Sequence, residues 1–293
     1  MRWWVTVPLL VVVVAGCSGL SAPGGVASET GTLTPVSVPA QPTPVGGTPW
    51  SATPANQLAP GLTTAGVTDP FALADAHHDE LANRSFTRIT HTTLAGPNGT
   101  LRVTHEVLRV AAGGRAYHLT ATSESAESYP VSAFAPHLEL WYADGPALFR
   151  VGEGEHVSYR VGTTGTLDGP VGDISGRDRL VGLYGTVDDW SVQPRIGWDD
   201  PRFVLASREP PDDDVLRLPT LVEDPRNAEL EIVTTGDGRV VTQRLRYDAT
   251  FDGQPVQIVR RVRFVKVGTT TVAEPAWLDE ARRETVDDRR GSG

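Results

Sequence analysis

The chain has 293 residues, with 26 basic and 36 acidic side chains and a formal net charge of −10. This acid excess argues against nucleic-acid binding, because nucleic-acid-binding proteins gather positive charge on one face, and we predict no nucleic-acid partner. The single cysteine excludes an intrachain disulfide, so the folded part must be stabilised by its own hydrophobic core.

The N-terminus carries an apolar run from Trp3 to Gly16. Its length of about 14 residues suits the apolar core of a signal peptide better than a membrane-spanning helix, which needs roughly 20. The run ends in the letters VAGC, which resemble a lipobox, the signal after which the cysteine becomes the first residue and receives a lipid. We therefore predict a lipoprotein signal peptide over residues 1–16, lipid attachment at Cys17 and a location on the outer face of the cell membrane. An uncleaved N-terminal anchor helix is the alternative.

Residues 17–64 are dominated by Pro, Thr, Ser and Gly and show no hydrophobic periodicity. Such a segment cannot bury enough apolar surface to offset the entropy lost on ordering. We predict a disordered tether here, a single folded domain over residues 65–282, and a disordered charged tail over residues 283–293.

The first element of the domain is predicted to be a helix over residues 70–82. Asp69 is suited to the N-cap, and Pro70 to the first helical position. The narrow apolar face of this helix is predicted from residues at helical spacing, namely Phe71, Ala74, His78 and Leu81.

Strand patterns follow. Residues 85–94 and 100–111 flank the turn cluster AGPNG, and the segments AYHLTATS, LELWYAD, ALFRVG and HVSYRVG come next, separated by Gly-rich turns. The segments WSVQPRIGW and RFVLASRE are predicted to pair, and Pro194 indicates a sheet edge or a bulge. Short helices are predicted over residues 177–187 and 215–224.

The last third of the chain predicts a long hairpin. Thr235-Gly236-Asp237-Gly238 is a turn signal, and Asp252-Gly253 joins VVTQRLRYDATF to PVQIVRRVRFVKV, which both alternate apolar and polar residues. One helix followed by consecutive antiparallel strands predicts an α+β fold. We expect a curved antiparallel sheet, a half-barrel, with one or more helices packed on its concave face.

The segments GVTDPFALADAH and YDATFDGQPVQIVRRVRFVKVGTTTVAEPAWLDEA resemble a family of haloarchaeal lipoproteins with no assigned activity. That family shares the lipobox, the Pro/Thr tether and the closing pattern from Val272 to Trp277, and the resemblance covers roughly residues 60–282. The overall plan is similar to the half-barrel lipid carriers of the LolA and LppX type, in which a curved sheet wraps helices and holds acyl chains. Trp277 lies near the end of the domain, and we expect it to pack the last segment onto the sheet.

The sequence contains none of the common catalytic motifs that can be recognised by spacing. The G-x-S-x-G elbow, the P-loop and a G-x-G-x-x-G helix start are absent from the sequence. His77 and His78 are adjacent, and adjacent helical residues point about 100° apart, so they are poorly placed to share a metal ion. We predict no enzyme activity, no cofactor and no metal site.

Two kinds of candidate site remain. Asn83 and Asn98 begin N-glycosylation sequons. Aromatic and apolar residues on a concave sheet face could line a ligand cavity or simply fill the core, and these are Phe71, Leu81, Trp141, Tyr159, Trp190, Trp198, Tyr247 and Phe264. We expect a membrane-anchored lipoprotein that binds or carries a lipid or another hydrophobic molecule. The alternative is a structural or protein-interaction module of the cell surface with a filled core, whose protein partners the sequence does not name.

Overall fold

The computed structural model describes residues 56–126, 136–143, 145–162, 173–195, 197, 200–212, 215–216 and 222–291. The predicted signal peptide, Cys17, most of the predicted tether and Trp198 lie outside these residues. Within the described ranges, no helix is long and apolar enough to cross a membrane.

Ordered structure begins earlier than the sequence patterns predicted. Three short strands, β1 (Gln57–Ala59), β2 (Leu62–Thr63) and β3 (Gly66–Val67), form a small antiparallel sheet inside the end of the predicted tether. Leu62 is fully buried and Ala59 is nearly so, because both contact the main hydrophobic core. A few apolar residues in a Pro/Thr-rich segment are therefore enough to dock it on the domain.

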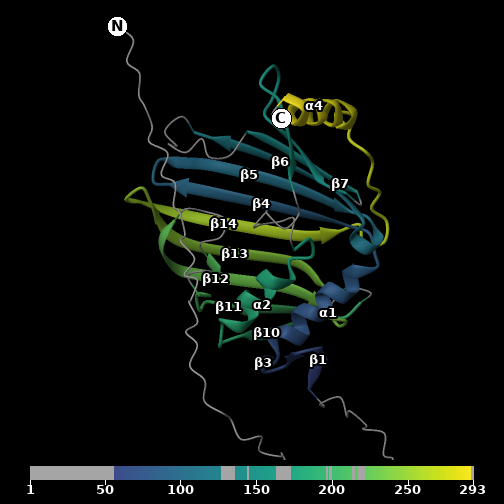
Figure 1. Ribbon diagram of the computed structural model, residues 1–293. Coiled ribbons are helices and arrows are strands. Elements are labelled where there is room, and N and C mark those ends of the chain that lie inside the picture. The colour runs from purple at the N-terminus through teal and green to yellow at the C-terminus, as the bar shows by residue number, and fades with distance from the viewer. Residues whose placement is uncertain are drawn as a thin grey trace, which may run out of the picture. The chain divides into compact units, whose positions relative to one another are not determined.

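The main sheet has eleven strands, all paired antiparallel in the order β10-β11-β12-β13-β14-β4-β5-β6-β7-β8-β9. It is curved and not closed into a barrel, so the predicted α+β half-barrel is confirmed (Figure 1). The strands are β4 (Phe86–Gly96), β5 (Gly99–Val110), β6 (Ala116–Ser125), β7 (His137–Ala143), β8 (Ala147–Val151), β9 (Ser158–Gly162), β10 (Ser191–Arg195), β11 (Arg202–Ser207), β12 (Glu223–Thr235), β13 (Val240–Phe251) and β14 (Gln254–Val265).

Strands from the two ends of the domain meet in the middle of the sheet. The long strand β14 pairs with β13 on one side and with β4 on the other, over nine residue pairs from Gln257↔Ala95 to Val265↔Thr87. The predicted β13–β14 hairpin and the β4–β5 pair are both present. Pro194 lies in β10, the edge strand, where its missing N–H interrupts no pairing.

Helix α1 spans Pro70–Ala82, as predicted, and the Asp69 side chain accepts a hydrogen bond from the Ala72 amide at 2.9 Å. Its buried face differs from the prediction. The buried residues are Leu73, Ala74, His77 and Leu81, whereas Phe71 is 59% exposed and His78 is also exposed.

The other helices also differ from the prediction in part. Helix α2 spans Arg177–Gly185, close to the predicted 177–187. The predicted helix over 215–224 is wrong at its end, because β12 begins at Glu223. Helix α4 spans Leu278–Gly291 and occupies most of the segment expected to be a disordered tail.

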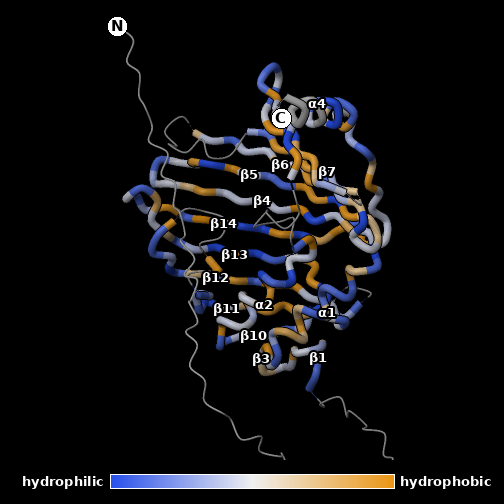
Figure 2. Tube along the Cα trace, viewed as in Figure 1, coloured by the Kyte–Doolittle hydropathy of each residue, from blue (hydrophilic) through white to orange (hydrophobic). Residues whose placement is uncertain are grey.

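The two faces of the sheet have different roles. We call the concave face the inner face, and it carries the main core and contacts α1 and α2. On it lie apolar residues from successive strands, namely Leu205, Leu230, Leu245, Ile258, Phe264, Phe86, Leu108, Leu119 and Leu140. Figure 2 shows hydrophobic and hydrophilic residues interspersed along the long strands, as expected for a sheet with one buried face. The opposite, outer face carries α4 at the β8–β9 end.

Candidate functional site

Four of the predicted cavity-lining residues lie in the main core. Leu81 is 2% exposed, Trp190 6%, Tyr247 2% and Phe264 5%. The buried polar atoms of the two larger aromatics are satisfied by backbone carbonyls: Trp190 Nε1 donates to Val187 at 2.9 Å and Tyr247 Oη donates to Leu216 at 2.8 Å. These side chains are part of the packing between the inner face and the segments that cover it.

The remaining predicted lining residues lie elsewhere. Leu140 is in the main core, so its neighbour Trp141 points to the outer face, where it packs with Trp277. Tyr159 stacks on the same Trp277, with ring centroids 6.0 Å apart. Phe71 is exposed, and Trp198 lies outside the described residues. The aromatic residues therefore belong to both faces rather than to one concave lining.

Helix α1 is fixed to the sheet through a buried histidine. His77 Nδ1 accepts a hydrogen bond from the Val240 amide at 3.0 Å, and His77 Nε2 donates to the Ser175 carbonyl at 3.0 Å. Burial lowers the pKa of His77 to about 4, so the ring is neutral with its proton on Nε2. The ring also contacts Phe264 edge-on, with centroids 4.6 Å apart. His77 is thus a structural link between α1, β13 and the loop before α2.

The loop before α2 is organised by one carboxylate. Asp173 accepts hydrogen bonds from the amides of Gly176, Arg177 and Asp178 at 2.8 to 2.9 Å, which satisfies N–H groups at the start of α2. The backbone carbonyl of the same Asp173 accepts from Arg88 Nη1 at 3.1 Å. The loop therefore joins α2 to β4 on the inner face.

One region of the inner face is polar and only half-buried. It comprises residues of β4, β5 and β14, and we call it the inner polar zone: Thr92, Arg102, Thr104, Glu106 and Arg260. Their orientation follows from strand alternation, because Arg260 lies between the buried Ile258 and Val262, and Glu106 is two residues from the buried Leu108. The apolar inner face therefore passes into a polar zone along β4 and β5.

Three arginines lie in or beside this zone. Burial lowers the pKa of Arg88 to about 10 and that of Arg179, on α2, to about 9, and it also lowers the pKa of Arg260. Repulsion from Arg260 contributes to the lowering at both of the other arginines, whereas Glu106 favours the charged forms of Arg88 and Arg260. Three guanidinium groups thus lie within electrostatic reach of one another beside one glutamate.

A second polar cluster lies on the outer face beneath the C-terminal segment. The Glu139 carboxylate accepts hydrogen bonds from Trp277 Nε1 at 2.9 Å and from His118 Nε2, His137 Nε2 and Arg150 Nη1, each at 3.1 Å. Burial alone would raise the pKa of Glu139, but the bonds from Trp277 and the histidines outweigh it and hold this pKa below its usual value. The cluster joins β6, β7 and β8 to the segment that leads into α4.

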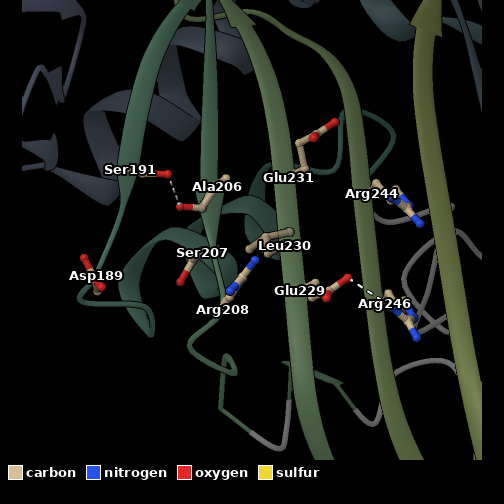
Figure 3. Close-up of a pocket in the computed structure, with 10 residues that line it drawn as sticks. All are labelled: Asp189, Ser191, Ala206, Ser207, Arg208, Glu229, Leu230, Glu231, Arg244 and Arg246. Atoms are coloured by element: carbon tan, nitrogen blue, oxygen red, sulfur yellow. Dashed lines mark hydrogen bonds and ion pairs between the residues drawn. The ribbon is translucent and has the colours of Figure 1, made fainter.

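The outer face of β10–β13 has a shallow groove with a volume of about 530 Å³. Figure 3 shows the charged side chains that line it, and they are Asp189, Arg208, Glu229, Glu231, Arg244 and Arg246. Arg246 pairs with Glu229 at 3.3 Å, whereas Arg208 and Arg244 form no ion pair within the described part of the chain. Mixed charges and few apolar groups make this groove suited to polar ligands or protein surfaces.

The two sequons lie at accessible positions. Asn83 is the exposed C-cap residue of α1, and Asn98 is exposed in the turn between β4 and β5. Their glycosylation remains a prediction. In the described ranges, no group of three or more His, Cys, Asp or Glu side chains is placed to hold a metal ion.

No protein-family model and no curated protein matches the sequence. Among solved structures, the chain is similar to LprF from Mycobacterium bovis, with 15% identity, a TM-score of 0.39, and 69% of this chain and 93% of that chain covered. It is similar to a LolA superfamily protein from Nitrosomonas europaea at 8% identity and a TM-score of 0.26, with the same two coverages. It is also similar to MucB, solved in complex with MucA, at 14% identity and a TM-score of 0.26, with 73% and 59% covered.

One of these solved structures is described as a LolA superfamily protein, whereas no family model matches to support the haloarchaeal family. All three TM-scores lie below 0.5. The fold assignment therefore rests on the strand order and the helix positions described above.

Proposed function

We propose that the protein is an exported lipoprotein, anchored to the outer face of the cell membrane through Cys17, whose inner sheet face binds a lipid or another hydrophobic ligand. The observation that carries this proposal is the change along the inner face from a broad apolar layer to the half-buried inner polar zone. A ligand with an apolar body and a polar end matches such a surface.

Helices α1 and α2 lie over only part of the inner face. In Figure 1, α1 and α2 lie over β10–β14, whereas β5–β7 extend beyond them. On this part of the inner face, Tyr117 stacks on Tyr142 with centroids 4.8 Å apart, next to Leu119 and Leu140. The Tyr117 hydroxyl has no hydrogen-bond partner among the described residues, and burial raises its pKa to about 12. Leu119 and Leu140 are already buried, at 3% and 0% exposure, so acyl chains would reach this layer only by displacing the groups that cover it.

If the inner face served packing alone, apolar side chains would make it at least as stable as arginines do. Burying a guanidinium costs free energy unless its charge is compensated, and apolar replacements of similar volume are often at least as stable. Arg88 and Arg260 nevertheless stand on the inner face in the central strands β4 and β14. Arg88 is held by the carbonyls of Asp173 and Ile174, so it is Arg260 that supports a role in binding rather than in packing alone.

The proposal is tested by isolating the full-length protein from the membranes of its native host in a mild detergent and extracting it with organic solvent. Mass spectrometry of the extract is expected to reveal a lipid in near-stoichiometric amount. A lipid attached covalently at Cys17 stays on the polypeptide and is distinguished in this way. An extract without lipid from folded protein would rule out the ligand-binding proposal.

The anchor is tested separately with the Cys17→Ser variant. We expect this variant to be released from the membrane or to accumulate as the unprocessed precursor. A variant that remains membrane-bound and is cleaved as efficiently as the wild type would show that lipidation at Cys17 is wrong.

A second candidate function is a protein-interaction module of the cell surface, and the outer groove on β10–β13 favours it. Charge reversal of both Arg208 and Arg244 changes this groove without touching the inner face. If that double variant loses a cross-linked partner that the wild type retains, and the solvent extract contains no lipid, the interaction module replaces the lipid-binding proposal.

A further inference from the structure

The inner polar zone has the residues and the register of an anion-binding surface. Arg260 on β14 is paired with Thr92 on β4, which in turn is paired with Thr104 on β5. All three side chains share the inner face, since each is two residues from another residue assigned to that face. The positions of Thr104, Thr92 and Arg260 therefore form one row on the inner face across three adjacent strands.

Arg260 is half-buried, and its guanidinium has unused donor capacity. Its Nε atom is buried and has no hydrogen-bond partner among the described residues. A buried donor without a partner costs about 1 to 3 kcal/mol, so an acceptor that reaches it gains this amount. The negative charge of Glu106 favours the charged form of Arg260.

We infer that Arg260, together with Thr92 and Thr104, binds the anionic head group of the hydrophobic ligand. This inference rests on the proposed lipid-binding function. The group recognised is an oxyanion of the phosphate, sulfate or carboxylate class, because a guanidinium presents its donors in a planar fork that matches such oxygens. The apolar layer beside the zone takes the chains of the same molecule.

Charge at the border of the zone favours the same ligand class. Arg88 and Arg179 lie within electrostatic reach of Arg260 and repel it. An anion bound at Arg260 relieves this repulsion, whereas an uncharged head group does not. Glu106 favours the charged form of Arg260, which is the form that attracts an anion.

The test uses the full-length protein in an uncharged maltoside detergent, with bound ligand counted by native mass spectrometry. Dimyristoylphosphatidic acid and dimyristoylglycerol are the two probes, since they share their chains and differ in the phosphate. We expect the wild type to bind the phosphatidic acid roughly 10- to 100-fold more tightly, the range expected for a hydrogen bond to a charged group. Arg260→Gln should reduce that binding to the level of the diacylglycerol.

Two further variants separate binding from folding. Arg261→Gln removes the neighbouring arginine, which is exposed on the outer face, and it should bind both probes as the wild type does. Arg260→Lys keeps the charge and should recover part of the preference. An Arg261→Gln variant that loses as much preference as Arg260→Gln would overturn the assignment.

The probes also separate the two proposals. Equal binding of phosphatidic acid and diacylglycerol by the wild type would overturn head-group recognition and leave the lipid-binding function standing, whereas binding of neither would remove both. Inorganic phosphate is the third probe. If it competes at the same concentration as phosphatidic acid, the zone is a site for the free anion and the lipid head group is the wrong source.

Discussion

The buried His77 makes the stability of the fold depend on pH. Its pKa falls from 6.5 to about 4 on folding because burial removes the ring from water. The folded state therefore binds fewer protons than the unfolded state between these values, and stability decreases as the pH falls below 6.5, with the loss complete near pH 4. Between pH 7.5 and pH 4.5 the contribution lost is about 2.5 kcal/mol, from 1.36 kcal/mol per pKa unit.

The assay is urea unfolding of the wild type and of His77→Gln at both pH values. At pH 7.5 the variant should be less stable by about 1 to 3 kcal/mol, because glutamine only partly replaces the links to Val240 and Ser175. At pH 4.5 the wild type has lost about 2.5 kcal/mol that the variant does not lose, so the stability difference should decrease by this amount and can change sign. Other titrating groups act equally in both proteins. His78→Gln is the matched control, with the exposed neighbour changed on the same helix. A difference between wild type and His77→Gln that is the same at both pH values would refute the reasoning.

Three further predictions concern packing. Leu140→Ala, at a fully buried inner-face position, should lower the free energy of unfolding by about 2 to 5 kcal/mol in urea titration. In thermal unfolding, Gly238→Ala should destabilise the protein more than Gly253→Ala, although both glycines have positive φ. A Cβ at 238 would lie 2.6 Å from a Cβ of α1, whereas a Cβ at 253 would meet nothing within 4 Å. Trp277→Phe removes the donor to Glu139 and should cost about 1.5 to 3 kcal/mol. It should also speed amide exchange in α4, and unchanged exchange there would contradict the described docking.

Local patterns in the sequence were sufficient for much of the sheet. Alternation in β13 and β14 identified the faces of Leu245, Tyr247 and Ile258 correctly, because a two-residue period leaves only two choices for a strand. The helix at α1 followed from its cap, which is also a local signal. The buried face of α1 could not be predicted locally, because its polar member, His77, forms hydrogen bonds only with backbone groups more than 90 residues away.

The candidate sites were harder to predict for the same reason. The inner polar zone depends on the pairing of β14 with β4, which no local signal specifies. The Glu139 cluster requires residues from three strands and from the segment before α4, and its bond from Trp277 to Glu139 joins residues 138 positions apart. Trp277 did pack onto the sheet as expected, but α4 was missed because its composition is highly charged and only Leu278 and Ala281 provide buried anchors.

The meeting of β4 and β14 at the centre of the sheet has a consequence for how the protein is made. A polypeptide that ends before residue 254 lacks the strand that joins the two halves, so β4 and β13 each keep a row of unmatched backbone groups. Completion of the fold must await nearly the whole chain, and long-range pairing of this kind is slow. A nascent chain built in this way keeps two unpaired strand edges until its last long strand is made.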